Sequence, residues 1–326
     1  MLYINRTSTD PYFNIAAEEY VLKNFSEDCF MLWQNEPCII VGKHQNTLAE
    51  INYDYVKEKG IPVVRRISGG GTVFHDLGNL NFTFIQNGKQ EELVNFRKYT
   101  KPILEVLKTM GINARFEGRN DLTINGKKFS GNAEHVHKNR TLHHGTLLFS
   151  SILPDLSDAL KVDPLKFKDK AVKSVRSRVT NLREHMKEQI GIEEFRNKIR
   201  DYVLNQYPDA EYYELSEADI EKINKLVEEK YRTWKWNFGY SPKYNFKKSV
   251  KSNGGYIEFN FDVKDGIIRQ VKIYGDFFNS IDIGEFEKSL IGLPHEEKHL
   301  KAKIASMDVG KYFNHVTANE IMKGIF

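Results

Sequence analysis

The chain is short of cysteine, which excludes a small secreted fold held together by disulfides. Its 326 residues include two cysteines, Cys29 and Cys38, without C-x-x-C spacing. Two cysteines cannot build the framework of several bridges that such folds need. No apolar run approaches the ~20 residues of a membrane-spanning helix. Arg6, Asp10 and Glu18 interrupt the start of the chain, where a signal peptide would be apolar. We therefore expect a soluble, cytoplasmic protein with no membrane partner.

The chain also lacks a large surplus of charge of either sign. It has 48 Lys and Arg against 44 Asp and Glu, a formal net charge of +4. This surplus is too small to indicate a nucleic-acid partner. Hydrophobic residues make up 40% of the chain and aromatic residues 12%, which is enough for a well-filled core. At this length, two domains are the usual arrangement.

Strand and helix signals alternate along the first part of the chain without repeats. Asn14 is expected to cap a first helix. Short apolar runs at Phe30–Trp33 and Cys38–Val41 indicate two strands of one hairpin. A capping-box pattern that begins at Thr47 predicts a helix that ends at Gly60. Hairpins with intervening helices favour an α+β fold over a doubly wound parallel sheet.

The pattern changes near residues 239–242, after a helical stripe that includes Ile220 and Ile223. Beyond this point two strand-like runs flank Asp265-Gly266, a hairpin signal, and three short helical stretches complete the chain. We therefore predict two α+β domains. The large one, residues 1–245, combines mixed and antiparallel sheets with helices, and the small C-terminal one comprises residues 246–326.

The most informative segment is Arg65-Arg66-Ile67-Ser68-Gly69-Gly70-Gly71. Three consecutive glycines let backbone N–H groups approach a bound anion closely. Arg65 and Arg66 alternate faces on a strand, so one of them can point at such a site, and the Ser68 hydroxyl can donate a further hydrogen bond. The pattern matches neither a Walker A loop nor G-x-G-x-x-G. The alternative is a flexible turn with two solvated arginines.

A second cluster surrounds Asn125-Gly126, a two-residue turn signal of the type I′ kind. Folding the chain at this turn brings Asp121 close to Lys127 and Lys128 on the neighbouring strand. A carboxylate for Mg²⁺ and an ammonium for a phosphate or carboxylate would then share one pocket. Because the two lysines point to opposite faces, only one can serve. The alternative is a surface hairpin with ordinary charge pairing.

Several histidines resemble metal-site patterns, but none of these patterns is complete. Four histidines lie on adjacent predicted strands without a fixed acidic ligand, so we expect no zinc site there: His135, His137, His143 and His144. The segment from His295 to His299 matches H-E-x-x-H. Its charged, post-proline setting favours an exposed helix start over a buried metalloprotease helix.

Two further patterns carry weaker signals. His75 and Asp76 with Ser68 could imitate a hydrolytic triad, but the chain has no G-x-S-x-G elbow. The segment Lys161–Arg183 holds eight Lys and Arg against two Asp. This basic segment predicts either an anion-binding loop or a nucleic-acid patch, and the scarcity of aromatic residues makes nucleic acid the weaker of the two. A solvated surface is the alternative.

Taken together, these segments resemble the lipoate–protein ligase family, and the resemblance covers nearly the whole chain. Six blocks occur in the family's order: Arg65–Asn79, Gly118–Asp121, Lys128–Ala133, His143–Leu148, Ser174–Asn181 and Trp234–Gly239. The resemblance implies that the large domain is catalytic. It implies a two-step reaction in which lipoate and Mg²⁺-ATP give lipoyl-adenylate and pyrophosphate. The lipoyl group then passes to a lysine of a carrier domain, in a 2-oxoacid dehydrogenase acyltransferase subunit or the glycine-cleavage H protein.

The resemblance also implies roles for individual residues, with Lys128 catalytic and Asp121 a Mg²⁺ ligand. The ATP- and adenylate-binding residues would be Arg66, Gly71, Thr72, Val73, Phe74, Asn120, Asp121 and Lys128. The lipoate-binding residues would be Arg65, Ser68, Gly70, Lys128 and His144. The basic segment would act as a lid, and Val73 and Leu147 would line the apolar pocket. Thr72 departs from the family, in which a small alanine is common at this position.

Neighbouring families supply the alternatives. Octanoyl and lipoyl transferases share the fold but attack a pre-activated donor with a cysteine, and this chain has no cysteine after Cys38. Biotin–protein ligases resemble the hairpin around Asn125-Gly126 but carry an Arg-rich glycine loop. A sensor that binds lipoate or its adenylate without turnover would keep the pocket and lose pyrophosphate release. We therefore expect an ATP-dependent ligase.

Overall fold

The computed structural model describes residues 1–326 except 89–93, 153–158, 161–178, 242–243, 276 and 278–280. Among the described residues the chain forms two compact units. One is drawn from Met1–Lys43, Ile61–Asp158 and Ser174–Arg232, and the other from His44–Gly60, Ala159–Lys173 and Thr233–Phe326. Across these described parts, no helix has both the length and the apolar composition needed to cross a membrane.

The first unit is built on an eight-stranded sheet with the order β11-β1-β2-β6-β10-β9-β8-β7. β1 runs parallel to β2 and β11, and the remaining neighbours are antiparallel. The mixed sheet confirms the predicted α+β class. The strands are β1 (Leu2–Asn5), β2 (Cys29–Trp33), β6 (Asn79–Asn87), β7 (Arg115–Glu117), β8 (Asp121–Ile124), β9 (Lys127–His137), β10 (Arg140–Leu148) and β11 (Glu211–Tyr213).

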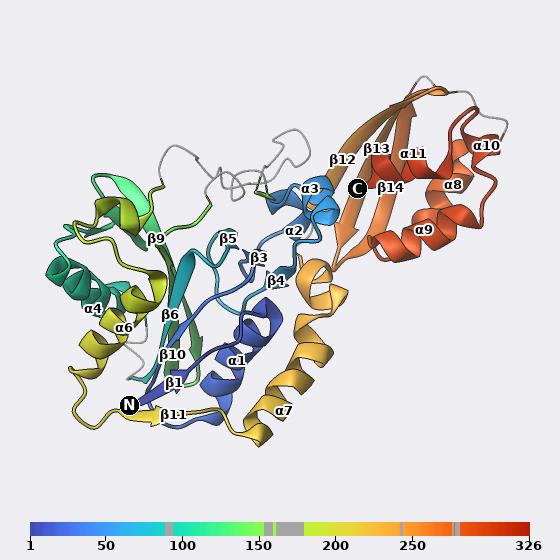
Figure 1. Ribbon diagram of the computed structural model, residues 1–326. Helices are drawn as coiled ribbons and strands as arrows, with labels where there is room; N and C mark the ends of the chain where they lie inside the picture. The colour runs from blue at the N-terminus through green and yellow to red at the C-terminus, as the bar shows by residue number, and fades with distance from the viewer. Residues whose placement is uncertain (89–93, 153–158, 161–178, 242–243, 276, 278–280) are drawn as a thin grey trace. The chain divides into compact units, whose positions relative to one another are not determined.

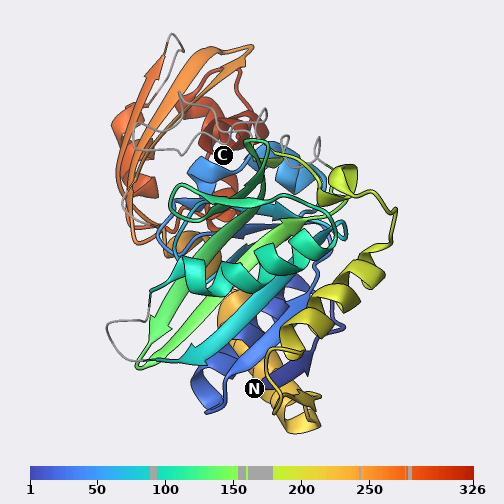
Figure 2. The same cartoon turned by 90° about the vertical axis from the view of Figure 1, so that its left-hand side faces the viewer.

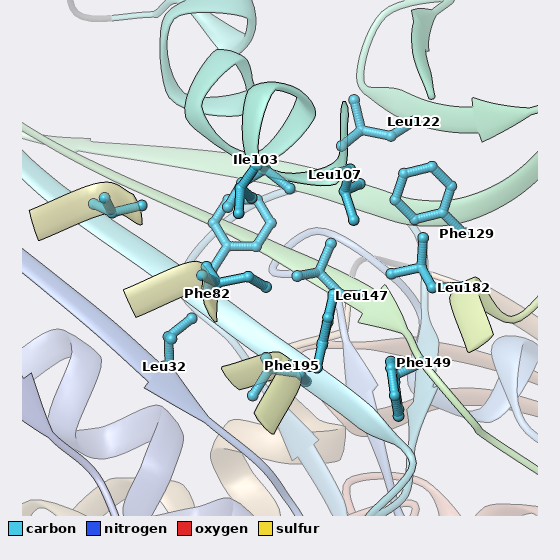
Figure 3. Close-up of a cluster of buried hydrophobic side chains, with 14 of the residues drawn as sticks. Leu32, Phe82, Ile103, Leu107, Leu122, Phe129, Leu147, Phe149, Leu182 and Phe195 are labelled. Carbon is cyan, nitrogen blue, oxygen red and sulfur yellow. The ribbon is translucent and has the colours of Figure 1, made fainter. Parts of the chain in front are cut away.

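Helices cover both faces of this sheet. α1 (Pro11–Asn24) and α7 (Glu217–Leu226) lie on one face, and α4 (Phe96–Thr109) and α6 (Ile192–Leu204) lie on the other, as Figures 1 and 2 show. Ile103 and Leu107 of α4 point toward Phe82 and Leu147 of the sheet (Figure 3). Leu147 is fully buried in this apolar cluster. Its expected place in the lipoate pocket remains a prediction.

A second, three-stranded sheet in the same unit has the order β4-β3-β5. It consists of β3 (Cys38–Val41), β4 (Val63–Arg65) and β5 (Val73–His75). The predicted hairpin between Phe30–Trp33 and Cys38–Val41 is therefore wrong, because β2 pairs with β1 and β6 while β3 belongs to this second sheet. The connection passes through Asn35, whose buried side-chain oxygen accepts a hydrogen bond from Asn14 Nδ2 at 2.8 Å.

Two helix predictions also need correction. Asp10, not Asn14, caps α1: its carboxylate accepts a hydrogen bond from the Tyr12 amide at 2.8 Å, and a proline follows at the first helical position. In the second unit, the single helix expected from Thr47 to Gly60 is two short ones, α2 (Thr47–Glu50) and α3 (Tyr53–Glu58). The helix is interrupted at Ile51 and Asn52. There the backbone N–H of Asn52 donates to the carbonyl of Ala159 at 2.9 Å and not to a carbonyl of the preceding helical turn.

The rest of the second unit is a three-stranded antiparallel sheet with helices on one face (Figure 1). Its strands are β12 (Tyr244–Ser252), β13 (Gly255–Lys264) and β14 (Ile267–Gly275). The predicted turn at Asp265-Gly266 is confirmed, with φ of 53° and 71°. Four described helices follow instead of the three predicted: α8 (Ile283–Leu290), α9 (Glu297–Ala305), α10 (Val309–Tyr312) and α11 (Ala318–Ile325).

Candidate active site

A loop of three glycines connects β4 to β5, and we call Ser68–Gly71 the glycine loop. Gly70 has φ +89°, a conformation that favours glycine, and a Cβ there would come within 3.0 Å of Arg66 Nη2. A Cβ at Gly69 or Gly71 would meet no atom within 4 Å. The backbone conformation and the packing therefore require glycine at position 70. The space beside the Cα atoms of Gly69 and Gly71 is open.

Both arginines before the loop are buried, which overturns the alternative of two solvated side chains. Arg66 donates from Nε to Ser68 Oγ at 3.0 Å and from Nη2 to the carbonyls of Gly69 and Gly71 at 2.6 and 2.8 Å. Burial lowers the pKa of Arg66 to about 10, so the guanidinium keeps its charge at neutral pH. Arg65 donates from Nη1 to the carbonyl of Gly42 at 3.0 Å. Arg66 therefore clamps the loop from within.

Ser68 is also tied to a distant carboxylate through a histidine. Its Oγ lies 2.6 Å from Nε2 of His144 on β10, and His144 Nδ1 lies 3.0 Å from both carboxylate oxygens of Glu18 on α1. Glu18 accepts a further bond from Thr83 Oγ1 at 2.6 Å. This carboxylate–imidazole–hydroxyl chain resembles a hydrolytic triad, but Ser68 is 0% exposed and its oxygen accepts from Arg66. The arrangement holds the loop in place.

The residues after the glycine loop form β5, which pairs with β3. Thr72 and Val73 are half-buried and Phe74 is buried. His75 and Asp76 do not meet Ser68: His75 Nδ1 lies 3.1 Å from Asn35 Nδ2, and Asp76 accepts from the amides of Gly78 and Ile152. Burial lowers the pKa of His75 to about 3, so its ring is neutral. The triad that the sequence argued against is not formed.

The hairpin of β8 and β9 brings the predicted lysine and carboxylate together. Asn125 and Gly126 have φ of 52° and 74°, which confirms the predicted turn. Lys128 Nζ lies 2.8 Å from Asp121 Oδ1, and each side chain is about two-fifths exposed, 39% and 38%. A Cβ at Gly131 would come within 3.1 Å of that ammonium. Lys127 is exposed on the opposite face, as expected from the strand alternation.

The glycine loop lies close to β9, the second strand of this hairpin. A Cβ at Gly70 would lie 3.9 Å from Cβ of Ala133, which is two residues beyond Gly131 on the same face of the strand. Ala133 in turn lies opposite His144, the partner of Ser68. The clamped loop, the Lys128 ammonium and the Asp121 carboxylate therefore surround one stretch of β9. A cation and a loop with exposed glycines on one surface can bind a polyanion.

The turn that precedes Asp121 is held by a reciprocal pair of asparagines. Asn120 Nδ2 donates to the carbonyl of Asn132 at 2.6 Å, and the amide and Nδ2 of Asn132 both donate to the carbonyl of Asn120 at 3.0 Å. Asn132 is buried and Asn120 is half-buried. Because Asn120 directly precedes Asp121, this pair fixes the point from which the carboxylate extends.

Residues 161–178 of the basic segment, with the lid predicted for it, lie outside the described residues. The structure describes its end, where Val179 forms a parallel bridge with Lys128 and the Thr180 amide donates to the Lys128 carbonyl at 2.9 Å. Leu182 is fully buried in the core of the first unit (Figure 3). The chain that follows the basic residues is therefore anchored beside the Lys128 backbone.

The histidine and cysteine patterns have structural explanations. His295 precedes α9, is buried, and stacks on Phe326 at 4.9 Å, whereas His299 is 51% exposed, so the H-E-x-x-H pair does not converge. Within the described ranges, no three His, Cys, Asp or Glu side chains gather to hold a metal. Cys29 and Cys38 are both 0% exposed, and burial raises the pKa of Cys29 to about 12. Neither thiol is a ready nucleophile.

Glu18 is the site residue that sequence analysis missed. It lies 126 positions from His144 and bonds it through space. The sequence does contain one indication of buried acidic residues. Glu18 and Glu19 are consecutive in a helix whose neighbouring residues, such as Ala17 and Val21, are apolar and buried. Two charged residues on a buried helix need partners within the fold, but the sequence does not say which ones.

Comparisons with known proteins agree with this geometry. The family described as the lipoyl protein ligase A/B catalytic domain matches residues 10–204, and the bacterial lipoate protein ligase C-terminus matches residues 241–325. The chain is 44% identical to lipoate–protein ligase 1 of Staphylococcus aureus over 98% of both chains. It is 40% identical to the lipoate-protein ligase LplJ of Bacillus subtilis over 100% of both chains.

Solved structures give the same result. A lipoate-protein ligase A bound with ATP is 26% identical with a TM-score of 0.64, covering 73% of this chain and 98% of that one. A bipartite lipoate protein ligase of Thermoplasma acidophilum, studied with its E2 lipoyl domain, is 30% identical with a TM-score of 0.65, covering 73% and 96%. With full-length relatives at 44% and 40% identity and matches to both family domains, the chain belongs to the lipoate–protein ligase family and is an enzyme.

Proposed function

We propose that this chain activates lipoate with ATP and transfers the lipoyl group to a lysine of a lipoyl carrier domain. In the first step a lipoate carboxylate oxygen attacks the α-phosphorus of ATP, the bond to the β-phosphate breaks, and pyrophosphate leaves. In the second step the carrier lysine nitrogen attacks the acyl carbon and AMP leaves. The nucleophile of the second step comes from the partner, so the buried Cys29 and Cys38 have no part in it.

The observation that carries this proposal is the meeting of the glycine loop and the Lys128–Asp121 pair at β9. Lys128 would contact the lipoate carboxylate and the α-phosphate, where negative charge collects during adenylation. The backbone of Gly71, Thr72, Val73 and Phe74 would contact the adenylate. A fixed cation beside exposed backbone donors stabilises such charge without reorganising during the reaction.

The remaining site residues have supporting roles in this proposal. Arg66 would act mainly by clamping the loop and by its positive charge, because its donors already serve Ser68, Gly69 and Gly71. Asn120 and Asp121 would face the phosphates. The half-buried carboxylate of Asp121 suits Mg²⁺, which prefers oxygen ligands and is usually held by one or two carboxylates together with substrate phosphates. Mg²⁺ would offset the phosphate charge when it is bound.

The lipoate subsite would lie where the loop meets β10. Ser68, Gly70 and His144 come together there, with Ser68 Oγ 2.6 Å from His144 Nε2. Arg65 is fully buried and donates to the carbonyls of Gly42 and Lys43, so its part would be to support the backbone near the subsite.

The carrier would be the lipoyl domain of a 2-oxoacid dehydrogenase acyltransferase subunit or the glycine-cleavage H protein. The Thermoplasma relative studied with its E2 lipoyl domain supports this class of partner. We place the reaction in the cytoplasm, where ATP is supplied. Residues 1–245 would form the catalytic domain and residues 246–326 the accessory domain.

The test is pyrophosphate release from ATP and Mg²⁺, measured with lipoate, with biotin, and without acid. We expect release with lipoate and none with biotin, and transfer of the lipoyl group to an added lipoyl carrier domain, seen as a mass increase of the carrier. Release with biotin alone would move the chain to the biotin ligases. Lipoate binding without any pyrophosphate release would favour a sensor, and transfer only from a pre-activated donor would favour a transferase.

A further inference from the structure

A buried carboxylate–imidazole pair behind the active-site hairpin has no part in the mechanism above. Glu134 on β9 and His143 on β10 face each other in the sheet, with Glu134 Oε1 2.9 Å from His143 Nδ1. Their side chains are 3% and 0% exposed. Glu134 Oε2 also accepts from the amide of Asn95, the N-cap of α4, at 3.1 Å. The imidazole stacks on the Tyr99 ring at 4.9 Å, so the pair lies in an apolar setting.

The second imidazole nitrogen contacts an amide whose orientation is fixed. Asn132 Nδ2 donates to the carbonyl of Asn120 at 3.0 Å and to Ser130 Oγ at 3.2 Å. A carbonyl oxygen only accepts, so turning the amide over would set two acceptors against each other. Asn132 Oδ1 must therefore face His143 Nε2, which lies 3.3 Å away. Because this oxygen accepts, Nε2 has to carry a hydrogen.

The hydrogen on His143 Nε2 bears on whether Glu134, the partner of Nδ1, is protonated. A neutral imidazole with hydrogen on Nε2 has a lone pair on Nδ1, and Nδ1 then needs a donor. Burial raises the pKa of Glu134 to about 7 and lowers that of His143 well below its usual range. The two side chains are almost fully buried and the imidazole stacks on Tyr99, and this apolar setting disfavours an ionised pair in the same direction as both shifts. The carboxylic acid form of Glu134 supplies the missing donor, and its other oxygen still accepts from Asn95.

The chain of bonds ends at the catalytic hairpin. Asn132 and Asn120 hold each other through the three bonds described above. Asn120 precedes Asp121, whose carboxylate pairs with Lys128 at 2.8 Å. A change at Glu134 would therefore reach Asp121 through His143, Asn132 and Asn120, without direct contact with a substrate.

We propose that Glu134 and His143 are positioning residues, and that a neutral Glu134 holds His143 in the tautomer that orients Asn132, Asn120 and, through them, Asp121. The inference rests on the proposed role of Asp121 and Lys128 toward Mg²⁺-ATP. Residues that orient a ligand-binding group in this way typically change affinity or activity roughly 10–100-fold when they are removed.

The decisive comparison is between Glu134→Gln and Glu134→Ala. A glutamine imitates the neutral acid, because its NH₂ can donate to His143 Nδ1 while its oxygen accepts from Asn95. We expect Glu134→Gln to stay within about twofold of the parent chain, and Glu134→Ala to raise the KM for ATP roughly tenfold or more with little change in the KM for lipoate. Equal effects of the two substitutions, or a larger change for lipoate than for ATP, would overturn the proposal.

A spectroscopic measurement keeps the test independent of folding losses. Histidine-labelled protein should show the His143 ring, assigned with His143→Gln, with hydrogen on Nε2 and a bare Nδ1, both in the parent chain and in Glu134→Gln. Hydrogen on Nδ1 would overturn the proposal. The matched control is Glu19→Gln, a carboxylate of similar burial bonded to Lys23 and Lys230, which should leave both KM values unchanged. A parent chain without lipoate-dependent pyrophosphate release would instead contradict the proposed function, and the ring measurement would still decide the tautomer.

Discussion

Ser68 and His144 are joined by a hydrogen bond of 2.6 Å between Oγ and Nε2, across 76 positions of the sequence. The bond belongs to a longer series of hydrogen bonds that ends in a group able only to donate on each side. At one end Arg66 Nε donates to Ser68 Oγ, and at the other Trp33 Nε1 donates to Thr83 Oγ1. The Glu18 carboxylate lies within this chain, where it accepts from Thr83 Oγ1 and lies 3.0 Å from His144 Nδ1. His144 thus links Ser68 to Glu18, and these bonds hold the glycine loop in one conformation.

Lys128→Ala tests the central assignment. The Lys128–Asp121 pair is partly exposed, so its loss should change the free energy of unfolding by about 1 kcal/mol or less. Pyrophosphate release should fall by roughly 10²–10³-fold, as expected when a fixed charge that stabilises the transition state is removed. The measurements are lipoate-dependent pyrophosphate release and a thermal melt.

Lys127→Ala is the matched control, because Lys127 is adjacent in sequence but exposed on the other face of the strand. It should keep most of the activity. A folded Lys127→Ala protein that is inactive would show that the wrong lysine was assigned. Normal pyrophosphate release by Lys128→Ala would contradict the proposed mechanism itself.

The two tight turns were predictable and the assignment of strands to sheets was not, for different physical reasons. The turns at Asn125-Gly126 and Asp265-Gly266 depend on positive φ at adjacent residues, which is a local property of these residue types. Whether Cys38–Val41 pairs with Phe30–Trp33 depends on which sheet each joins, and that is decided by contacts with distant segments. The burial of Arg65 and Arg66 also escaped prediction, because their carbonyl partners are backbone groups common to every residue.

The site residues also divide into those predictable from nearby sequence and those that depend on distant segments. Lys128 pairs with Thr123, which lies two residues from Asp121 on the same strand, and a tight turn joins the two strands. Sequence spacing therefore predicted the contact between Asp121 and Lys128. The carboxylate that orients His144 comes from the first helix, and nothing in the sequence around the glycine loop indicates it. Tertiary contacts of this kind require the fold.

Gly145→Ala tests the packing that surrounds Asn132. A Cβ at Gly145 would come within 2.2 Å of Asn132 Oδ1 and 2.6 Å of the Phe82 ring, and neither neighbour can move freely within the sheet. We expect a loss of roughly 1–3 kcal/mol of unfolding free energy from overpacking, or more. Denaturant unfolding measures it. Gly69→Ala, whose Cβ would meet nothing within 4 Å, should unfold as the parent chain does. Equal losses for both would contradict the packing argument.

Thiol reagents test whether a cysteine takes part in transfer. Cys29 and Cys38 are fully buried, and burial raises both thiol pKa values, that of Cys29 to about 12. We expect the native protein to react with a thiol reagent only after unfolding, and iodoacetamide to leave lipoyl transfer unchanged. Rapid inactivation that substrate prevents would instead indicate an acyl-enzyme. Reaction of the unfolded chain with two equivalents of reagent confirms that the thiols are free.

Glu19 should contribute stability that is lost in acid. Burial alone would raise its pKa, but hydrogen bonds from Lys23, Lys230 and Tyr231 outweigh burial and lower the pKa to about 2. Because the folded pKa lies below the unfolded one, the contribution is complete above the unfolded value near 4.5 and disappears as the pH falls toward 2. Glu19→Gln should therefore be less stable than the parent chain at pH 7, and this difference should shrink steadily between pH 5 and pH 3. Urea unfolding at several pH values measures it, and a difference that stays constant with pH would show that Glu19 is not ionised in the fold.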